Sequence, residues 1–208
     1  MEGLSVFVSA SIPDPDRWTG EFDPSQIRDA IVSMSREVLA AGGRIVTAAH
    51  PTVAPMLLYV AAEVVDGSPQ RPPVSVYQSG LFELILPAET QRFRESGLCD
   101  FKFVEAVAGE TAEPSNRSKS LRRMRREMLE ETQPNAAIFV GGMEGIREEW
   151  QQVSELVPSC LRYAFGRPGG EAATLRARPA SALSRQLQES DLYPYLASLV
   201  VNDIVASR

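Results

Sequence analysis

The sequence predicts a doubly wound α/β protein with a mainly parallel sheet flanked by helices. Short valine- and isoleucine-rich runs, typical of buried strands, alternate along the chain with segments of helical periodicity. The 208 residues suit one α/β domain, and a content of 44% hydrophobic and 23% charged residues is ordinary for a globular protein. We therefore expect residues 1–208 to form a single domain.

The first half of the chain predicts three strands separated by helices. Strands are expected over 4–11, 44–49 and 74–79, where short apolar runs meet turn-forming segments. Asp23 before Pro24 indicates a helix start, because aspartate accepts from free backbone N–H groups and proline needs no donor there. A second, apolar helix is predicted over 56–65, and the segment 81–97 favours a helix.

The second half of the chain also alternates between predicted strands and predicted helices. Strands are expected over 99–107, 136–142 and 160–166, and helices over 116–132, 145–157 and 194–206. The stretch RPGGEAATL, at 167–175, is expected to open a further helix. The apolar helix 194–206 either caps the sheet or forms an oligomer seam.

Charge and composition restrict the classes of function. The net charge of −6 argues against general nucleic-acid binding. The run 116–128 is nevertheless basic, which fits either a site for a small anion or a solvated helix face. The first residues lack the basic start of a signal peptide, and no apolar stretch reaches the ~18 residues of a membrane span. We expect a cytoplasmic protein in which Cys99 and Cys160 are buried free thiols.

Small residues follow four of the predicted strands. In open parallel sheets ligands bind at the carboxyl ends of the strands, and a helix start there adds unpaired N–H donors that suit phosphate. Tight turns alone are the other explanation for glycine pairs. His50 is the only histidine, so no metal site is expected, and it either positions a ligand or acts in acid–base chemistry. The four strand ends are Ser9-Ala10-Ser11, Ala48-Ala49-His50-Pro51, Gly141-Gly142-Met143-Glu144-Gly145 and Gly169-Gly170.

The combination of these motifs resembles the SLOG superfamily. The double glycine after a late strand, preceded by an arginine- and methionine-rich helix, is similar to that group, and SVFVSASIP with GGMEGI is similar to its sensor-type branch from bacterial defence systems. The resemblance covers about residues 4–175. It implies a modified Rossmann-like fold that binds a nucleotide or an ADP-ribose-like or NAD-derived ligand, with no further cofactor.

The resemblance also implies a set of contact residues. Carried over by motif, the ligand would meet Ser9, Ala10, Ser11, Arg17, His50, Pro51, Arg122, Arg125, Arg126, Gly141, Gly142, Met143, Glu144, Gly145, Gly169 and Gly170. The expected partners are a small-molecule nucleotide and an effector protein, and no association with a membrane is expected. Because dimers are frequent in the family, the resemblance also implies a homo-oligomer.

Departures from the enzymatic members favour a sensor. The Lonely Guy enzymes carry PGGxGTxxE, whereas Val140 and Ile146 stand here in place of the proline and threonine. Glu149 matches the glutamate by its offset from Gly145, and Glu148 matches it by the offset from Gly141. The alternative is a nucleotide N-glycosidase, in which Glu149 and Arg125 would be catalytic, with Glu144 and Arg126 as the other candidates for the same two roles. The Ala48-Ala49 pair replaces a Gly-Gly common among sensors, which narrows that part of the site.

Overall fold

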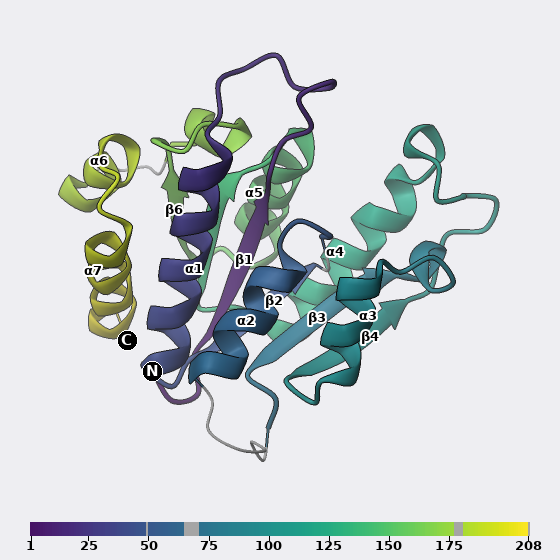
Figure 1. Cartoon of the computed structure of the whole chain (residues 1–208), viewed down its shortest axis with the longest axis horizontal. Helices are drawn as coiled ribbons and strands as arrows, with labels where there is room; N and C mark the ends of the chain where they lie inside the picture. The colour runs from purple at the N-terminus through teal and green to yellow at the C-terminus, as the bar shows by residue number, and fades with distance from the viewer. Residues whose placement is uncertain (49, 65–70, 177–180, 208) are drawn as a thin grey trace.

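A single all-parallel sheet of six strands organises the protein, in the order β4-β3-β2-β1-β5-β6. The computed structural model describes residues 1–48, 50–64, 71–176 and 181–207, and Figure 1 shows the sheet between its layers of helices. The predicted α/β class is confirmed. The strands are β1 (Ser5–Ser11), β2 (Arg44–Ala48), β3 (Val74–Ser79), β4 (Cys99–Val104), β5 (Ala136–Gly141) and β6 (Leu161–Phe165).

Successive side chains of a strand point to opposite faces of the sheet and pack into two separate hydrophobic cores. Val6 and Val8 of β1 pack into one cluster and Phe7 into the other, as the two-residue period of a strand requires. The first cluster includes residues of α1 (Pro24–Ala40), α2 (Ala54–Val64), α3 (Ala88–Glu95), α6 (Ala182–Glu189) and α7 (Tyr193–Ala206). The second lies under α4 (Ser118–Thr132) and α5 (Glu144–Leu156). Helices therefore cover both faces, which explains why the strands read as nearly continuous apolar runs.

The start of α1 follows the sequence prediction closely. The Asp23 side chain accepts hydrogen bonds from the backbone N–H groups of Ser25 and Gln26, and Pro24 occupies the first turn. The buried face of α1 packs against α7, whose Leu196 and Val200 are completely buried. The apolar helix at the end of the described chain thus buries its apolar face against α1.

Two helical predictions were wrong. The segment 81–97 is not one helix: a 3-10 turn covers Gly80–Phe82, and α3 begins only after Pro87, because a residue before proline is disfavoured in helical conformation. The stretch 167–175 holds only a 3-10 turn at Glu171–Thr174, since Gly169 and Gly170 adopt positive φ angles just before it. Helix α6 was not predicted, and the predicted strand 99–107 ends at Val104. Ala49 and Val65 lie outside the described residues.

Both cysteines are buried free thiols, as the sequence indicated. Burial raises the pKa of Cys99 to about 11 and that of Cys160 to about 12, because the thiolate form loses its hydration. Thiolate is the reactive form, so neither residue is suited to nucleophilic chemistry at neutral pH.

The strand order reverses direction between β1 and β5. From β1 the chain adds β2, β3 and β4 on one side, and then returns to place β5 and β6 on the other. The segment between β1 and α1 and the segment between β4 and α4 both rise above the same edge of the sheet (Figure 1). This edge, at the carboxyl ends of the strands, is where open α/β sheets place their ligands.

Candidate ligand-binding site

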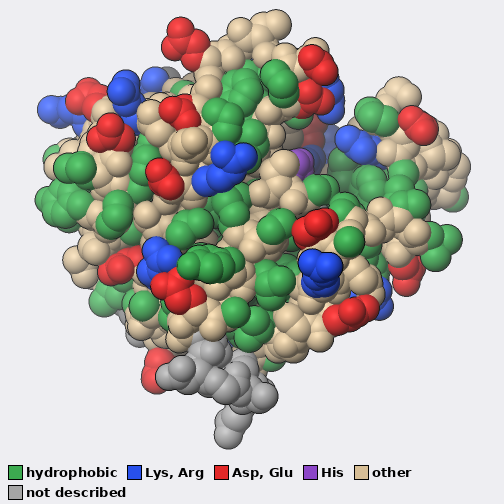
Figure 2. Space-filling view, viewed as in Figure 1, with side chains coloured by type: hydrophobic (Ala, Val, Ile, Leu, Met, Phe, Trp, Pro, Cys, Tyr) green, Lys and Arg blue, Asp and Glu red, His purple; other side chains and the backbone are tan. Residues whose placement is uncertain are grey.

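A cavity of about 580 Å³ lies at this edge of the sheet. Its walls come from the ends of β1, β2 and β3, from the start of α5 and from the first turns of α4. Figure 2 shows the molecule hollowed between two lobes, with the purple histidine side chain inside the hollow. The volume falls within the range of about 300–1,000 Å³ that is usual for small-molecule sites.

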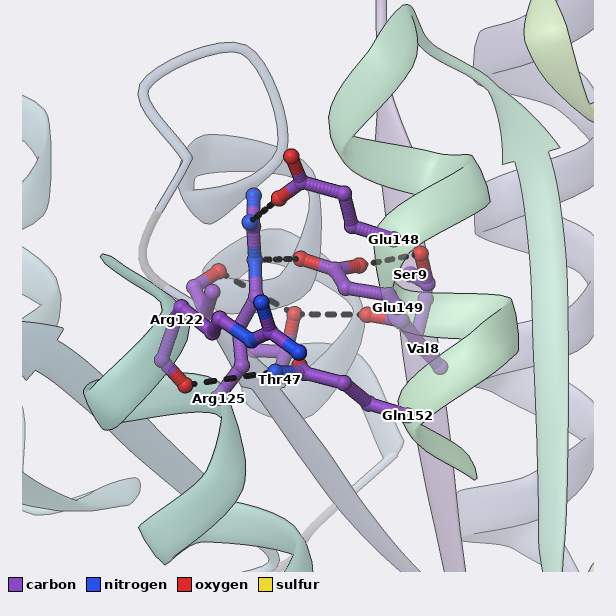
Figure 3. Close-up of polar contacts among 9 residues, drawn as sticks. Val8, Ser9, Thr47, Arg122, Arg125, Glu148, Glu149 and Gln152 are labelled. Carbon is purple, nitrogen blue, oxygen red and sulfur yellow. Dashed lines mark hydrogen bonds and ion pairs between the residues drawn. The ribbon is translucent and has the colours of Figure 1, made fainter. Parts of the chain in front are cut away.

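A cluster of four polar side chains forms one wall of the cavity, and we call Ser9, Arg125, Glu148 and Glu149 the Arg125 cluster (Figure 3). The Ser9 hydroxyl donates to Glu149 Oε2. Arg125 Nε donates to Glu149 Oε1 at 2.8 Å, and Arg125 Nη1 donates to Glu148 Oε2 at 2.6 Å. Residues from β1, α4 and α5 are thereby joined at a single point.

The Arg125–Glu149 pair is largely removed from solvent. The side chains are 12% and 10% exposed, respectively, whereas Glu148 is 57% exposed. A buried carboxylate needs a counter-ion and further hydrogen bonds to offset its lost hydration, and Arg125 and Ser9 supply both. Both Glu149 oxygens are therefore engaged within the protein, one by Ser9 and the other by Arg125.

Gly145 makes room for this arrangement. A Cβ atom at Gly145 would lie 2.8 Å from Arg125 Nη2, so the guanidinium passes directly over the first turn of α5. The absence of a side chain thus has a packing role here. It lets a cation from α4 reach the two glutamates of α5.

The double glycine after β5 is occupied by protein contacts. Gly142 has a φ of +68°, its N–H donates to Ser11 O at 2.7 Å, and its carbonyl accepts from Glu171 N at 2.8 Å. A Cβ atom at Gly170 would lie 2.6 Å from the carbonyl carbon of Gly141. The glycines therefore allow two loops to meet closely, and the part of this loop that faces the cavity is the turn from Met143 to Ile146.

The predicted contact residues divide into two groups. The larger group lines the cavity: Ser9, Ala10, Ser11, Arg17, His50, Pro51, Arg125, Met143, Glu144, Gly145 and Glu149. The remaining six lie outside its lining: Arg122, Arg126, Gly141, Gly142, Gly169 and Gly170. The Arg126 side chain pairs with Glu130 on its own helix, and the Arg122 carbonyl accepts from Gln152 Nε2 at 3.3 Å, which ties α4 to α5.

Several lining residues were missed by sequence reasoning. Thr47, at the end of β2, donates its hydroxyl to Val8 O at 2.8 Å. An apolar wall comes mainly from the segment between β3 and α3 and from one face of α4, namely Phe82, Ile85, Leu86, Leu121 and Met124. Ile85 is an apolar residue that is 60% exposed. Only the fold shows that the segment carrying it borders the cavity.

His50 is held neutral beside the cavity. The Thr52 hydroxyl and backbone N–H lie 2.9 and 3.3 Å from His50 Nδ1, so this atom accepts and the proton is on Nε2. His50 is an exposed residue by its surface area, but the protein around it still removes part of the hydration of its ring. This desolvation, with a smaller effect of the Arg117 charge, lowers the pKa of His50 to about 4.

The pKa of His50 gives a direct prediction. Unfolded histidine takes up a proton near pH 6.5, so its contribution to folding stability should diminish as the pH falls from 6.5 toward 4. Because this is the only histidine, its imidazole proton signals in an NMR titration should stay unshifted between pH 7 and 5. A midpoint near 6.5 would contradict the desolvated position. The His50→Gln variant, with no such signals, serves as the assignment control.

The start of α5 is the helix end directed at the cavity. Its N-cap residue, Met143, gives no side-chain cap, and Met143, Glu144 and Gly145 line the cavity. The start of α4 differs, because the Glu110 carboxylate accepts from the N–H groups of Lys119 and Ser120. The start of α5 therefore offers N–H groups without a side-chain cap, together with the partial positive charge of a helix N-terminus, to a ligand. Among the described residues, no group of three or more acidic, histidine or cysteine side chains could hold a metal ion.

A parallel sheet with a cavity at its reversal point is the arrangement of a Rossmann-like α/β protein. The model of the SLOG cluster3 family matches residues 17–198, and the chain therefore belongs to the SLOG cluster3 family. Membership makes it a nucleotide-related Rossmann-like domain. No curated protein matches the chain. Within the ranges that the structure describes, none of the helices has the length and hydrophobicity to span a bilayer.

Proposed function

We propose that this protein is a sensor domain that binds a nucleotide ligand of the NAD-derived or ADP-ribose-like class. The cavity has a suitable volume, an apolar wall for a base and hydrogen-bonding groups for a sugar. Aromatic and apolar side chains with a few fixed polar groups are the usual lining of such sites. The resemblance to sensor-type SLOG domains supports a role in bacterial defence or signalling.

The state of Glu149 is the observation that favours binding over catalysis. Glu149 Oε2 accepts from Ser9 and Oε1 accepts from Arg125. A general base must have an oxygen within reach of the proton it removes, and both oxygens of this carboxylate are engaged within the protein. Binding, followed by a change in assembly or in contact with an effector protein, is the function that this arrangement supports best.

The same pair supports a second candidate, a nucleotide N-glycosidase. A glutamate carboxylate beside a cavity can stabilise the positive charge that develops on a ribose as its glycosidic bond breaks. Glu149 lies on the cavity wall, and Arg125 Nε lies 2.8 Å from its Oε1. In this candidate, release of the free base would accompany binding.

A thermal-shift screen with chromatography tests the proposal. The panel consists of ADP-ribose, NAD, cyclic ADP-ribose isomers and nucleoside monophosphates. A sensor should show a raised melting temperature with the ligand recovered intact, because a ligand at 100 times its Kd adds about 2.7 kcal/mol to stability. Recovery of free base would support the glycosidase. A panel with neither shift nor turnover would contradict both candidates.

The Glu149→Gln variant separates the two candidates directly. In a sensor the amide should keep affinity for the ligand found in the screen within a few-fold of the wild type, whereas in a glycosidase turnover should fall at least a hundredfold, because only the carboxylate stabilises positive charge. Glu155→Gln is the matched control, since Glu155 is exposed on the same helix and does not line the cavity. Measuring both affinity and product release in each variant distinguishes lost binding from lost chemistry.

A further inference from the structure

The charges of the cavity wall are distributed unevenly. Among the described residues, three arginines and three glutamates line it. All three glutamates, Glu144, Glu148 and Glu149, belong to α5. The arginines come from elsewhere: Arg125 from the middle of α4, Arg117 from the residue before α4, and Arg17 from the segment between β1 and α1.

Arg125 has little capacity left for a ligand. Its Nε and Nη1 atoms donate to Glu149 and Glu148, and its Nη2 atom lies over the first turn of α5, against Gly145. Two carboxylates thus surround the one guanidinium. A phosphate placed here would have to displace Glu148 and would meet the negative charge of Glu149. Arg125 serves as the charge partner of the glutamates.

Arg17 and Arg117, which we call the mouth arginines, are in a different state. In the described part of the chain, neither guanidinium forms an ion pair with a carboxylate. Arg117 is held in place without being neutralised, since its Nη1 donates to Ala112 O at 3.2 Å and its guanidinium lies 5.7 Å from the centre of the Phe82 ring. A cation fixed by neutral partners is prepared to bind an anion.

His50 complements the mouth arginines. The charge of Arg117 contributes to the lowered pKa of His50, so the two groups are near each other on the cavity wall. His50 Nδ1 accepts from Thr52, which leaves Nε2–H as a neutral donor. This donor adds a hydrogen bond for an anion without adding a charge that depends on pH near neutrality.

We propose that the mouth arginines and His50 form the anion subsite of the cavity, which takes the pyrophosphate or phosphate of the ligand. Glu144 and Glu148 of α5 then accept hydrogen bonds from its hydroxyl groups, as acidic side chains do with ribose in other Rossmann-like sites. The inference rests on the proposed function, because it orients the same nucleotide ligand. It also assigns the phosphate to side chains other than those of the basic α4 face and the double glycine.

Calorimetric titration with inorganic pyrophosphate tests the subsite apart from the base and the sugar. Wild-type protein should bind the anion, and Arg117→Gln and Arg17→Gln should each weaken binding about tenfold or more, since each removes a charge-assisted hydrogen bond. Arg123→Gln is the matched control: Arg123 lies on α4, pairs with Glu105 and does not line the cavity. That variant should bind within about twofold of the wild type. Melting temperatures check that all variants are folded.

The outcomes separate this inference from the proposed function. Absence of pyrophosphate binding in the wild type, or wild-type affinity in both mouth variants, would overturn the anion subsite even if a nucleotide from the panel binds. Pyrophosphate binding that depends on the mouth arginines would support the subsite even if no nucleotide in the panel binds. The lack of nucleotide binding would then contradict only the nucleotide-sensor proposal.

Discussion

Replacing Gly170 by alanine is expected to lower the free energy of unfolding by on the order of 3 kcal/mol. Gly170 has φ +70° and ψ −169°, a region essentially restricted to glycine, where a residue with a Cβ is strained by roughly 1–3 kcal/mol. The added Cβ would also lie 2.6–2.9 Å from three backbone atoms of Gly141. Backbone at the end of a central strand cannot move aside as a flexible side chain can, so overpacking adds roughly 1–3 kcal/mol. Urea denaturation at neutral pH measures the loss.

Gly109→Ala is the matched control for this substitution. Gly109 has a φ of +82°, but nothing lies within 4 Å of the position of its Cβ atom. It therefore carries the conformational cost without the clash, and about 1 kcal/mol is expected. Equal losses in the two variants would mean that the close approach of the loops after β5 and β6 is not tight, and that the double glycine is available to a ligand after all.

Replacing Arg125 by methionine should cost about 3 kcal/mol of stability and leave the cavity wall disordered around Glu149. Removal of one partner leaves a buried carboxylate without its cation, which is the costly way to break such a pair. The Arg125→Met/Glu149→Met double variant should recover a large part of the loss, because no uncompensated charge remains. A double-mutant cycle by urea denaturation gives the coupling between the two side chains.

Arg126→Met provides the control on the neighbouring position of α4. Arg126 pairs with Glu130 four residues later, and both side chains are about half exposed, at 49% and 51%. Such a pair contributes about 0.5 kcal/mol or less. A loss for Arg125→Met as small as that for Arg126→Met would show that solvent reaches the Arg125 cluster and that the Glu149 carboxylate is open to other partners.

These two expectations concern different parts of the proposed mechanism. The glycine contact fixes where the loops after β5 and β6 lie, and so where the start of α5 points. The Arg125 cluster fixes the charge of the wall that α5 presents to the cavity. If both hold, α5 forms a wall of the cavity whose position and charge are fixed by contacts within the protein.

Much of the fold could be predicted from local patterns. The predicted strand 74–79 matches β3, and Asp23 caps α1 as expected. These features depend on interactions within a few residues, or on a burial pattern that the sequence carries directly. The failures, at 81–97 and 167–175, lie where proline and glycine override a pattern that otherwise resembles a helix.

The candidate site was predictable only in part. The ends of β1 and β5 indicated the edge of the sheet at which the cavity lies, because parallel strands all place their carboxyl ends there. Sequence reasoning assigned phosphate binding to the glycines and to several α4 arginines together. The structure gives the glycines contacts with other loops and engages Arg125, while Arg126 pairs along its own helix. Which arginine pairs with which carboxylate depends on the distance between the helices. The sequence of either helix alone does not determine this distance.

The sequence by itself determined the class of this protein: its alternation of apolar strands and helices, its caps and its motifs were enough for an α/β fold of the SLOG group. Only the tertiary structure decided what each motif does. Ser9 and Glu149 are 140 residues apart in the chain and share a hydrogen bond, and Gly170 matters because Gly141 lies against it. Local patterns arise from a residue's immediate neighbours, whereas charge pairing and close backbone contact arise only when the sheet brings distant segments together.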